Sequence, residues 1–479
     1  MFESENSGAA AVDAIMAATR QENAAGAARL AAIGELYAVR APDDDTDKLC
    51  WVIDGFGGLV CEIAAALGVS AKRARAQLDR AITLRERLPQ VAAIYAQGLI
   101  DAVMVAMIVS RTDLIIDDAL AREVDGRLAA KILRWGRLSK PKMEQRIDAV
   151  IAALDPAGVH GPPAVSDSRY LDVRPLGPGR VQVSASLSAA SGATLDAVLD
   201  AIAGQVCRED PRSHDRRRAE AIDVLTTGGR LRCQCGQSDC PAGVAEDRAA
   251  PAVSARAMIQ VIAEPGAAQG RAVGFLPGFG QIPPEQVVQL AALGGGAVVR
   301  QVAVPPDAPE PGYRPSAALA EFVRCRDLTC RFPGCDRPAV RCDLDHTVPY
   351  PAGPTHASNL KSLCRVHHLV KTFHTGWKDQ QFPDGTIVWT APSGHVYVTR
   401  PDGAHWFPTL GTPTGQVNTG EQALPKQARG RCMPTRKVTR TEERRAKILA
   451  ERQGNQERLD EQRRQRELEL AANYQPPPF

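Results

Sequence analysis

A stretch of 39 residues from Cys330 to His368 constrains the fold of this chain more than any other feature, because it holds two closely spaced ligand pairs. Cys330 and Cys335 form a Cys-x4-Cys pair around a Phe-Pro-Gly turn, and Cys364 and His367 form a Cys-x2-His pair. Tetrahedral zinc in a closed structural site takes all four ligands from the protein, and both spacings suit it. The sequence therefore predicts that these four residues bind one structural zinc ion.

The segment between the two pairs carries a second kind of chemistry. An alternating, strand-like run reaches Asp345 and ends at His346. An imidazole of near-neutral pKa can accept a proton from water. A carboxylate and a second histidine, here Asp345 and His368, can hold Mg²⁺ or another divalent metal against a phosphate. Asn359 is neutral and can orient a base through a hydrogen bond, so the pattern indicates a general base beside a divalent metal.

These residues resemble the HNH family of nucleases, whose fold is two strands and a helix around one metal. The resemblance implies a DNA endonuclease that hydrolyses phosphodiester bonds, with His346 as the general base and Asn359 as the residue that positions it. It makes Asp345 and His368 the ligands of the catalytic metal. Many relatives have Cys where this chain has His367, so the assignment of the two adjacent histidines to the two metals stays open.

Several alternatives remain beside this interpretation. Lys371 lies one turn after His368 and could contact a flanking phosphate, although a plain surface lysine is an equal alternative. Cys325 and Cys342 fall outside the pairs and are expected to be small buried residues. The rival function is a catalytically silent DNA-binding or mobile-element accessory protein that uses the HNH fold as a zinc-stabilised scaffold.

Length and charge set the expected organisation and partner. A chain of 479 residues exceeds what one core supports, so two or three domains are expected. From Phe322 to Lys378 there are nine Lys/Arg and four Asp/Glu, a balance of +5. This excess favours a polyanionic partner such as DNA. A small-molecule substrate is not evident from the sequence, which leaves the oligomeric state open as well.

The N-terminal sequence and the cysteines indicate the compartment. The opening residues, MFESENSGAAAVDA, have neither the basic n-region nor the apolar h-region of a signal peptide. The longest apolar run, Ala102 to Val109, is too short for a membrane span. Twelve cysteines, eight of them in two clusters, suit a reducing compartment with metal sites better than a disulfide framework. The sequence thus predicts a cytoplasmic protein without a membrane segment.

Along the chain, the patterns predict a multi-domain α+β protein with a mainly helical N-terminal region, an α/β middle block and a C-terminal zinc-stapled ββα-metal (HNH) module. Residues 51–82 have a helix-turn-helix pattern with a Gly-Val-Ser turn. Its Lys72, Arg73 and Arg75 would either meet DNA phosphates or form a solvated basic face, and the second alternative is favoured. Strands are expected at 170–173 and 181–185, with a helix after them, and a further strand at 258–262. Residues 385–399 indicate a hairpin that turns at 392–394, and Trp377 and Trp389 are expected to be core residues.

The middle block resembles the DUF222 region, also called the 13E12-repeat family, which is found before HNH modules in actinobacteria. The residues that carry the resemblance are the run Arg216–Ala221 after Asp210 and the preceding strand-helix order. The resemblance assigns no chemistry to the N-terminal part. The expected domains are a flexible N-terminus (1–26), a DUF222-like domain (27–275), a Pro-rich linker (300–316), the HNH domain (317–408) and a basic charged tail (409–479).

Two further segments allow more than one interpretation. Cys233, Cys235 and Cys240 could bind a second zinc if His214 or Cys207 came near, or they could form an inert or redox-sensitive loop. Residues 426–474 hold fourteen Lys/Arg and eight Asp/Glu, a balance of +6. This tail is expected to form charged helices broken near Gly454, either solvated or disordered, with a non-specific DNA clamp as the alternative.

Overall fold

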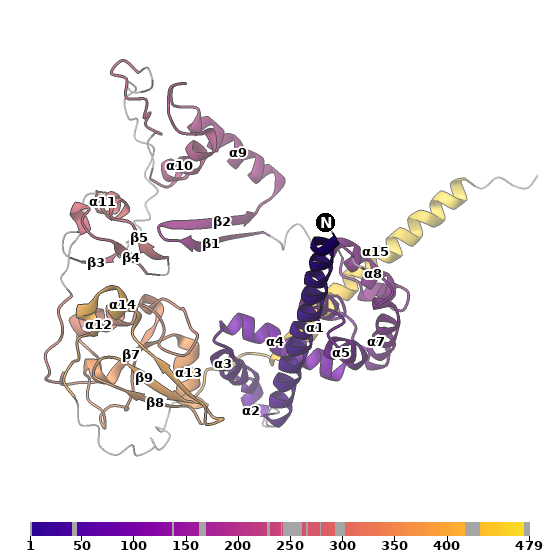
Figure 1. Cartoon of the computed structure of the whole chain (residues 1–479), viewed down its shortest axis with the longest axis horizontal. Coiled ribbons are helices and arrows are strands. Elements are labelled where there is room, and N and C mark those ends of the chain that lie inside the picture. Colours follow the sequence, from indigo (N-terminus) through magenta and orange to yellow (C-terminus); the bar gives the residue numbers. More distant parts are fainter. Residues whose placement is uncertain are drawn as a thin grey trace, which may run out of the picture. The chain divides into compact units, whose positions relative to one another are not determined.

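The computed structural model describes residues 2–40, 46–136, 138–161, 169–227, 230–240, 242, 261–264, 267–277, 279–292, 302–374, 376–416 and 432–473. The chain forms two compact units, the first from Met1–Pro162 with Val299–Phe479 and the second from Pro163–Val298. The first unit is therefore built from two segments that are far apart in the sequence. Its first boundary falls inside the segment 27–275 that was expected to be one domain. Helices and strands are mixed, as a coarse α+β class requires (Figure 1).

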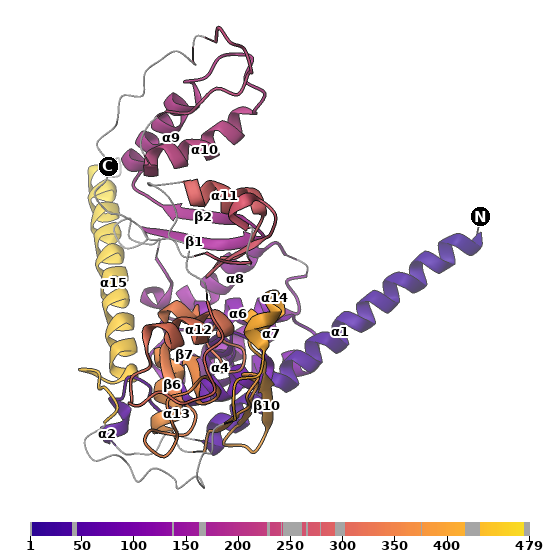
Figure 2. The same ribbon diagram turned by 90° about the vertical axis from the view of Figure 1, so that its left-hand side faces the viewer.

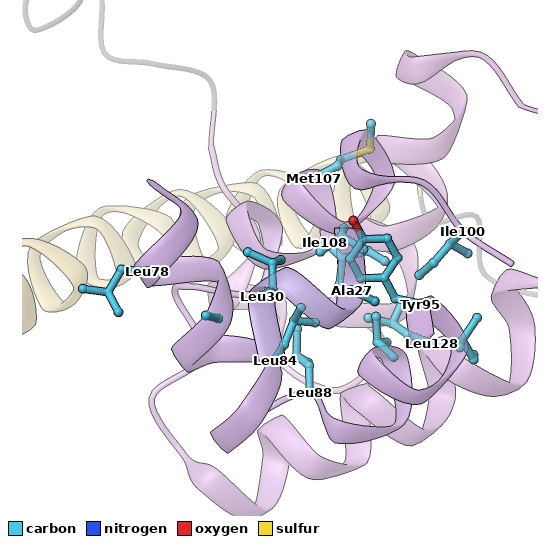
Figure 3. Packing of buried hydrophobic residues seen from close by; sticks show 14 of the residues in the cluster. Ala27, Leu30, Leu78, Leu84, Leu88, Tyr95, Ile100, Met107, Ile108 and Leu128 are labelled. Carbon is cyan, nitrogen blue, oxygen red and sulfur yellow. The ribbon is translucent and has the colours of Figure 1, made fainter. Parts of the chain in front are cut away.

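The N-terminal part of the first unit is helical, as the apolar spacing predicts. Its helices pack around one core, in which Leu78, Leu88 and Ile108 are at most 1% exposed (Figure 3). Asp54, Asp101 and Asp117 cap the starts of three helices by accepting backbone N–H bonds. The helices are α1 (Phe2–Val39), α2 (Thr46–Leu49), α3 (Gly55–Leu67), α4 (Ala71–Glu86), α5 (Pro89–Ala96), α6 (Ala102–Arg111), α7 (Asp118–Ile132) and α8 (Lys140–Ala152).

Residues 2–26 of the predicted flexible N-terminus (1–26) form the first part of α1, which runs unbroken to Val39 (Figure 2). Its alanine-rich sequence has high helix propensity, and the helix gains packing further along through Ala27 and Leu30. Arg20 Nε also donates to the carbonyl of Gln97 at 2.9 Å. The described part of this segment is therefore helical, and its flexibility stays a prediction.

The predicted helix-turn-helix pattern corresponds to α3 and α4, which meet at 108°. Gly68, at φ 61°, ends α3 in the left-handed region that glycine adopts without strain. The basic side chains Lys72, Arg73 and Arg75 are exposed. The guanidinium of Arg75 lies 5.6 Å from the ring centre of Phe56. A solvated basic face is therefore present, and a contact with DNA there stays a prediction.

The second segment of the first unit contains a two-stranded antiparallel pair followed by a helix. Asp345 in β6 lies opposite Lys361 in β7, and His346 lies opposite Leu360. Cys364 occupies the N-cap position of the helix that follows β7, without a side-chain cap hydrogen bond. The elements of this part are α12 (Ala317–Asp327), β6 (Asp343–His346), β7 (Leu360–Leu363), α13 (Arg365–Phe373), β8 (Lys378–Gln381), β9 (Ile387–Thr390), β10 (Val396–Thr399) and α14 (Asp402–Trp406).

Trp377 and Trp389, predicted to be core residues, are 7% and 0% exposed. Their rings meet that of Phe332 edge-on, at centroid distances of 4.7 and 5.2 Å. The predicted hairpin is confirmed as β9 and β10, with Gly394 in its turn. Because Cys61 of α3 joins the same core, the helical part and this part share one apolar interior.

The charged tail contains one continuous helix, α15 (Arg440–Ala472), where two helices broken near Gly454 were expected (Figure 2). The neighbouring Arg, Gln and Glu residues are good helix formers and carry the helix through the glycine. Asn455 is buried, and its amide donates to the carbonyls of Ala157 and Val159 at 2.9 and 2.8 Å. The tail is thus docked on the helical part at this point.

Ion pairs hold the start of the tail to the helical part. Arg436 and Arg440 contact the carboxylate of Asp54 at 2.6 and 3.0 Å. Further along α15, Arg452 contacts Asp155 at 2.6 Å. These arginines belong to the basic excess that a DNA clamp would need, so part of that excess is neutralised within the protein. A clamp formed by the other basic residues of the tail stays a prediction.

The second unit begins with a hairpin of β1 (Tyr170–Gly177) and β2 (Arg180–Ser186), which confirms the predicted strands. The packed helices α9 (Ala189–Ala203) and α10 (His214–Thr227) follow, and α10 contains the DUF222-like basic run. A small sheet of β3 (Ile262–Ala263), β4 (Gly274–Leu276) and β5 (Gly280–Ile282) precedes α11 (Pro284–Ala292). The strand expected from Met258 lies mostly outside the described residues.

Across the described ranges, no single helix is both long and apolar enough to cross a membrane. The bent pair α3 and α4 passes that test by length and composition alone. Both helices have buried faces in the core of the first unit.

Candidate functional site

The two predicted zinc-ligand pairs come together in space. One ligand atom from each of Cys330, Cys335, Cys364 and His367 lies within 4.8 Å of all the others. His367 Nδ1 is 3.5 Å from Cys330 Sγ and 3.2 Å from Cys364 Sγ. Three thiols and one imidazole nitrogen at this spacing are the donor set of a closed zinc site. Burial holds the pKa of the Cys330 thiol well above its ordinary value, so a thiolate there needs a cation beside it.

Local packing explains why the ligands converge. His367 stacks on Phe332, with ring centres 4.0 Å apart and planes at 6°. Gly334 has φ 75° in the turn between the first two cysteines, and a Cβ there would lie 3.1 Å from the carbonyl oxygen of Val69. The turn therefore needs glycine both for its conformation and for its contact with the helical part. Cys325 and Cys342 are buried, as predicted for the leftover thiols.

The second group of thiols lies in the second unit. Cys207, Cys233, Cys235 and Cys240 place their sulfur atoms within 4.8 Å of one another. Of the two fourth ligands considered from the sequence, Cys207 is the one that joins the group. Two Cys/His clusters in this chain could thus bind a metal such as zinc.

The predicted catalytic-metal ligands also face each other. His368 Nε2 in α13 lies 3.5 Å from Asp345 Oδ1 in β6. The other ring nitrogen, Nδ1, lies 2.9 Å from Asp343 Oδ2. A carboxylate can only accept, so Nδ1 carries the proton and a neutral ring turns its Nε2 lone pair toward Asp345. Two acceptors face one another there, an arrangement that a bound cation would satisfy. The adjacent His367 and His368 therefore turn to different clusters.

His346, the predicted base, is 7% exposed and is fixed by residues from two loops. Its Nε2 lies 2.9 Å from the hydroxyl of Thr355, which donates to the carbonyl of Gly312. The hydroxyl hydrogen of Thr355 is used in its bond to Gly312, so the hydroxyl oxygen can only accept from His346. The neutral ring therefore carries its proton on Nε2 and has its lone pair on Nδ1. Tyr313 stacks on the ring at 5.3 Å. Burial lowers the pKa of His346 below its ordinary value, although Asp345 opposes this shift.

Asn359, predicted to orient the base, forms hydrogen bonds with the loop that follows His346. Its side-chain oxygen accepts from the backbone N–H of Val348 at 2.8 Å. Its amide donates to the carbonyls of Val348 and Pro354 at 3.0 and 2.9 Å. Asn359 therefore closes the loop between β6 and Thr355. None of these three hydrogen bonds reaches His346 itself, so they position the ring only indirectly.

The ammonium group of Lys371 lies inside the site, whereas a DNA phosphate or the open surface was expected to receive it. Its Nζ is 2.6 Å from Asp345 Oδ2 and 2.7 Å from the carbonyl oxygen of His346. Its side chain is 13% exposed. The helical spacing brings Lys371 back over β6, where the buried carboxylate attracts it. A phosphate contact would require Lys371 to leave these partners.

Sequence reasoning missed a second buried lysine. Lys361 is fully buried in β7, and its Nζ lies 2.8 Å from Asp345 Oδ2 and 2.7 Å from Asp379 Oδ2. Although burial alone would raise it, these ammonium groups hold the pKa of Asp345 below its usual range. The sequence held one signal for this contact: antiparallel pairing of the two adjacent strands places residue 361 opposite Asp345.

Thr355 and Tyr313 were missed because they come from connecting segments. Thr355 follows a Gly-Pro turn, and Tyr313 belongs to the Pro-rich linker, which pairs with the site through a bridge between Glu310 and Thr355. A hollow of about 500 Å³ lies beside the site and is lined in part by Thr347, Asn359 and Gln381. It borders the loop after His346.

Comparisons with known proteins address the family of the chain. The family model for the domain of unknown function DUF222 matches residues 17–327. Uncharacterized protein Rv3776 of Mycobacterium tuberculosis is 42% identical over 433 residues, which cover 85% of this chain and 82% of the relative. Uncharacterized protein Rv2100 of the same organism is 40% identical over 487 residues, covering 92% and 87%. No solved structure matches the chain. The family match ends just before Cys330, so it does not cover the candidate site.

Proposed function

This chain belongs to the DUF222 family, and from the geometry of its candidate site we propose that it is a metal-dependent DNA endonuclease of the HNH type. The observation that carries the proposal is the approach of His368 Nε2 to Asp345 Oδ1 at 3.5 Å, beside the buried His346. A strand pair and the helix after it bring all three residues together. An acid–base group next to a hard-metal donor pair is what phosphodiester hydrolysis requires.

In this proposal, His346 takes the proton from the attacking water through Nδ1, because Nε2 is committed to Thr355. Its low pKa keeps the ring neutral, and therefore able to accept a proton, at neutral pH. Tyr313 and Thr355 fix the plane of the ring, so little reorientation is needed. Asn359 keeps the connecting loop closed around Thr355.

The donor atoms fit a divalent metal. Asp345 and His368 would hold Mg²⁺ or another divalent ion, and Asp343 would fix the tautomer of His368. When bound, such an ion supplies positive charge to the phosphate and the leaving oxygen. Zinc on Cys330, Cys335, Cys364 and His367 would hold β7 and α13 in register, because Cys364 lies at their junction.

DNA is the proposed partner because the part around the site has an excess of basic residues. Nine Lys/Arg and four Asp/Glu lie between Phe322 and Lys378. A separate hollow in the helical part is lined by Arg29, Arg73 and Arg80. Clusters of arginine attract phosphates, so this second surface could follow the duplex beyond the site.

A plasmid-nicking assay with several divalent metals tests the proposal. The wild-type protein should nick supercoiled DNA, and His346→Ala should lower the rate by roughly 10²–10⁴-fold, the usual contribution of a general base. His395→Ala is the matched control, because His395 is exposed in the hairpin turn. Zinc content should be the same in all three proteins. Equal rates for wild type and His346→Ala would remove His346 from the mechanism.

A specific observation favours a rival function, a catalytically silent DNA-binding scaffold. Asp345 Oδ2 is already bound by Lys361 and Lys371, and Tyr313 covers one face of His346. A site closed in this way could have lost its reaction while keeping its zinc. Salt-dependent DNA binding without nicking under any metal would support the rival. Lys371→Met distinguishes the two, since removing one of the two ammonium partners of Asp345 should change nicking in an active enzyme and leave a scaffold unaffected.

A further inference from the structure

The second unit contains four cysteines arranged around one point. Cys207 lies just after α9, whereas Cys233, Cys235 and Cys240 lie in the irregular segment after α10. Their sulfur atoms are within 4.8 Å of one another, and those of Cys207 and Cys233 are 3.4 Å apart. All four are free thiols. Residues separated by a helix and a turn thus converge from two segments.

The spacing of the sulfur atoms matches a tetrahedral metal site. Zinc–sulfur bonds of about 2.3 Å place the sulfurs of a four-cysteine site about 3.8 Å apart. A pair of disulfides would instead draw the four atoms into two bonded pairs. Cys240 is buried, and the other three are half-buried, so the group is partly shielded from solvent. Soft thiolate donors with this geometry select zinc over Mg²⁺ or Ca²⁺.

Interactions that do not involve the cysteines hold the same segment in place. The buried pair of Asp210 and Arg212 is central to them. Arg212 Nη2 donates to the carbonyl of Arg232 at 2.6 Å, and Asp210 Oδ2 accepts from the backbone N–H of Gln234 at 2.9 Å. The backbone around Cys233 and Cys235 is therefore positioned by a built framework, and the convergence of the thiols is a property of the fold.

The apolar core next to the cluster is small. It consists of Ile202, Ala221 and Leu231, with a few half-buried neighbours. Small modules with so little buried apolar surface commonly depend on a metal or disulfides for their fold. The irregular segment that carries three of the cysteines has no helix or strand of its own between Thr227 and Cys240 in the described residues. A metal would add a link to the end of α9 beside the packing of Leu231 against Ile202.

We propose that Cys207, Cys233, Cys235 and Cys240 bind a structural zinc ion that ties the segment after α10 to the end of α9. This site is independent of the nuclease proposal, because none of its ligands belongs to the first unit. The chain would therefore bind two structural zinc ions, one in each unit.

Elemental analysis of full-length protein purified without chelators tests the proposal. Wild type should contain two zinc ions per chain, and Cys207→Ser should contain one. Cys335→Ser should also contain one, and the double variant none. Cys432→Ser is the matched control, since Cys432 is exposed and belongs to neither cluster; it should keep two. A Cys207→Ser variant with the zinc content of wild type would overturn the proposal.

Thiol labelling of the wild-type protein covers the case in which Cys207→Ser fails to fold. Cys235 and Cys207 should resist alkylation until a chelator is added, whereas Cys432 should react at once. Rapid labelling of Cys235 in untreated protein would contradict a bound metal. A disulfide between Cys207 and Cys233, found by mass spectrometry in freshly purified protein, would contradict it equally and would make the cluster a redox pair.

Discussion

The two cysteine clusters have similar ligands but very different surroundings. The cluster around Cys330 lies in a core that includes Phe332, Trp377 and Trp389 and extends into α3. The cluster around Cys207 lies beside a core of three small or medium side chains. Zinc at the Cys330 cluster would therefore join segments that already pack well, whereas zinc at the Cys207 cluster would take the place of packing. Ligand spacing shows where a metal can bind, and the surrounding core determines how much of the fold depends on it.

The largest expected effect is the loss of a zinc ligand in each cluster. Structural zinc supplies folding free energy on the order of 10 kcal/mol in small modules. Cys207→Ser should therefore unfold the segment around residues 230–240, which should become sensitive to limited proteolysis. Cys335→Ser should lower the melting temperature of the first unit but leave its core collapsed around Trp389. Near-ultraviolet circular dichroism, which reports on packed tryptophans, would check this. Equal protease sensitivity of the two clusters would contradict the expected difference in how far each depends on zinc.

The next largest effect, on the stability of the first unit, is expected from a cavity in the core around Trp389. Trp389→Ala removes a fully buried ring, and such truncations cost about 3–5 kcal/mol. Chemical denaturation should show this loss for the first unit, while the cysteines of the second unit keep their protection. Trp406→Ala is the control, because Trp406 is 38% exposed and should cost much less. A small effect of Trp389→Ala would mean that the zinc, and not the core, stabilises this part.

A smaller effect, on activity, is expected from the loss of the hydrogen bond between Thr355 and His346. Thr355→Val removes the acceptor of the His346 Nε2 proton, and loss of such an orienting hydrogen bond typically lowers activity about 10- to 100-fold. Thr355→Ser should restore the rate. The ring nitrogens of His346 should show a change of tautomer by NMR in the Val variant alone. Unchanged NMR signals together with lowered activity would point to a loss of packing instead.

The smallest effect concerns pH and should be confined to the first unit. A hydrogen bond to Asp113 raises the pKa of His160 to about 9, with a further contribution from Glu451 of α15. The folded-state pKa lies above the unfolded one, so this stabilisation is complete below about pH 6.5 and is lost as pH rises through about 9. The loss should be on the order of 1 kcal/mol after solvent screening. His160→Gln should flatten the pH dependence of unfolding of the first unit.

Much of the fold and of the candidate site follows from short-range patterns. Ligand spacing found the Cys330 cluster, alternation found β6, and apolar periodicity found the N-terminal helices. Each of these signals depends on residues a few positions apart. The three-residue pattern at Cys233 found most of the second cluster, but Cys207 could be joined to it only as one of two alternatives.

The interactions that sequence reasoning missed depend on distant partners. A lysine in a short strand is expected to be solvated, so the buried Lys361 becomes plausible only when Asp345 and Asp379 are known to face it. A helix break was expected near Gly454, whereas the adjacent Asn455 is buried in a continuous helix because the carbonyls of residues 157 and 159 accept from its amide. In both cases, a polar group is buried because a partner far away in the sequence compensates its desolvation.

The ion pair between Asp54 and Arg436 has a consequence for synthesis of the protein. The two residues are 382 positions apart. At about 5–20 residues per second, a ribosome needs roughly 20–80 s to make Arg436 after Asp54. During that interval the helical part exposes the apolar surface of Ile53 and Cys61 that the segment around Trp377 later covers. The nascent helical part should therefore be a substrate for chaperones, and release from them should begin when the segment around Trp377 emerges and be complete once Arg436 has emerged.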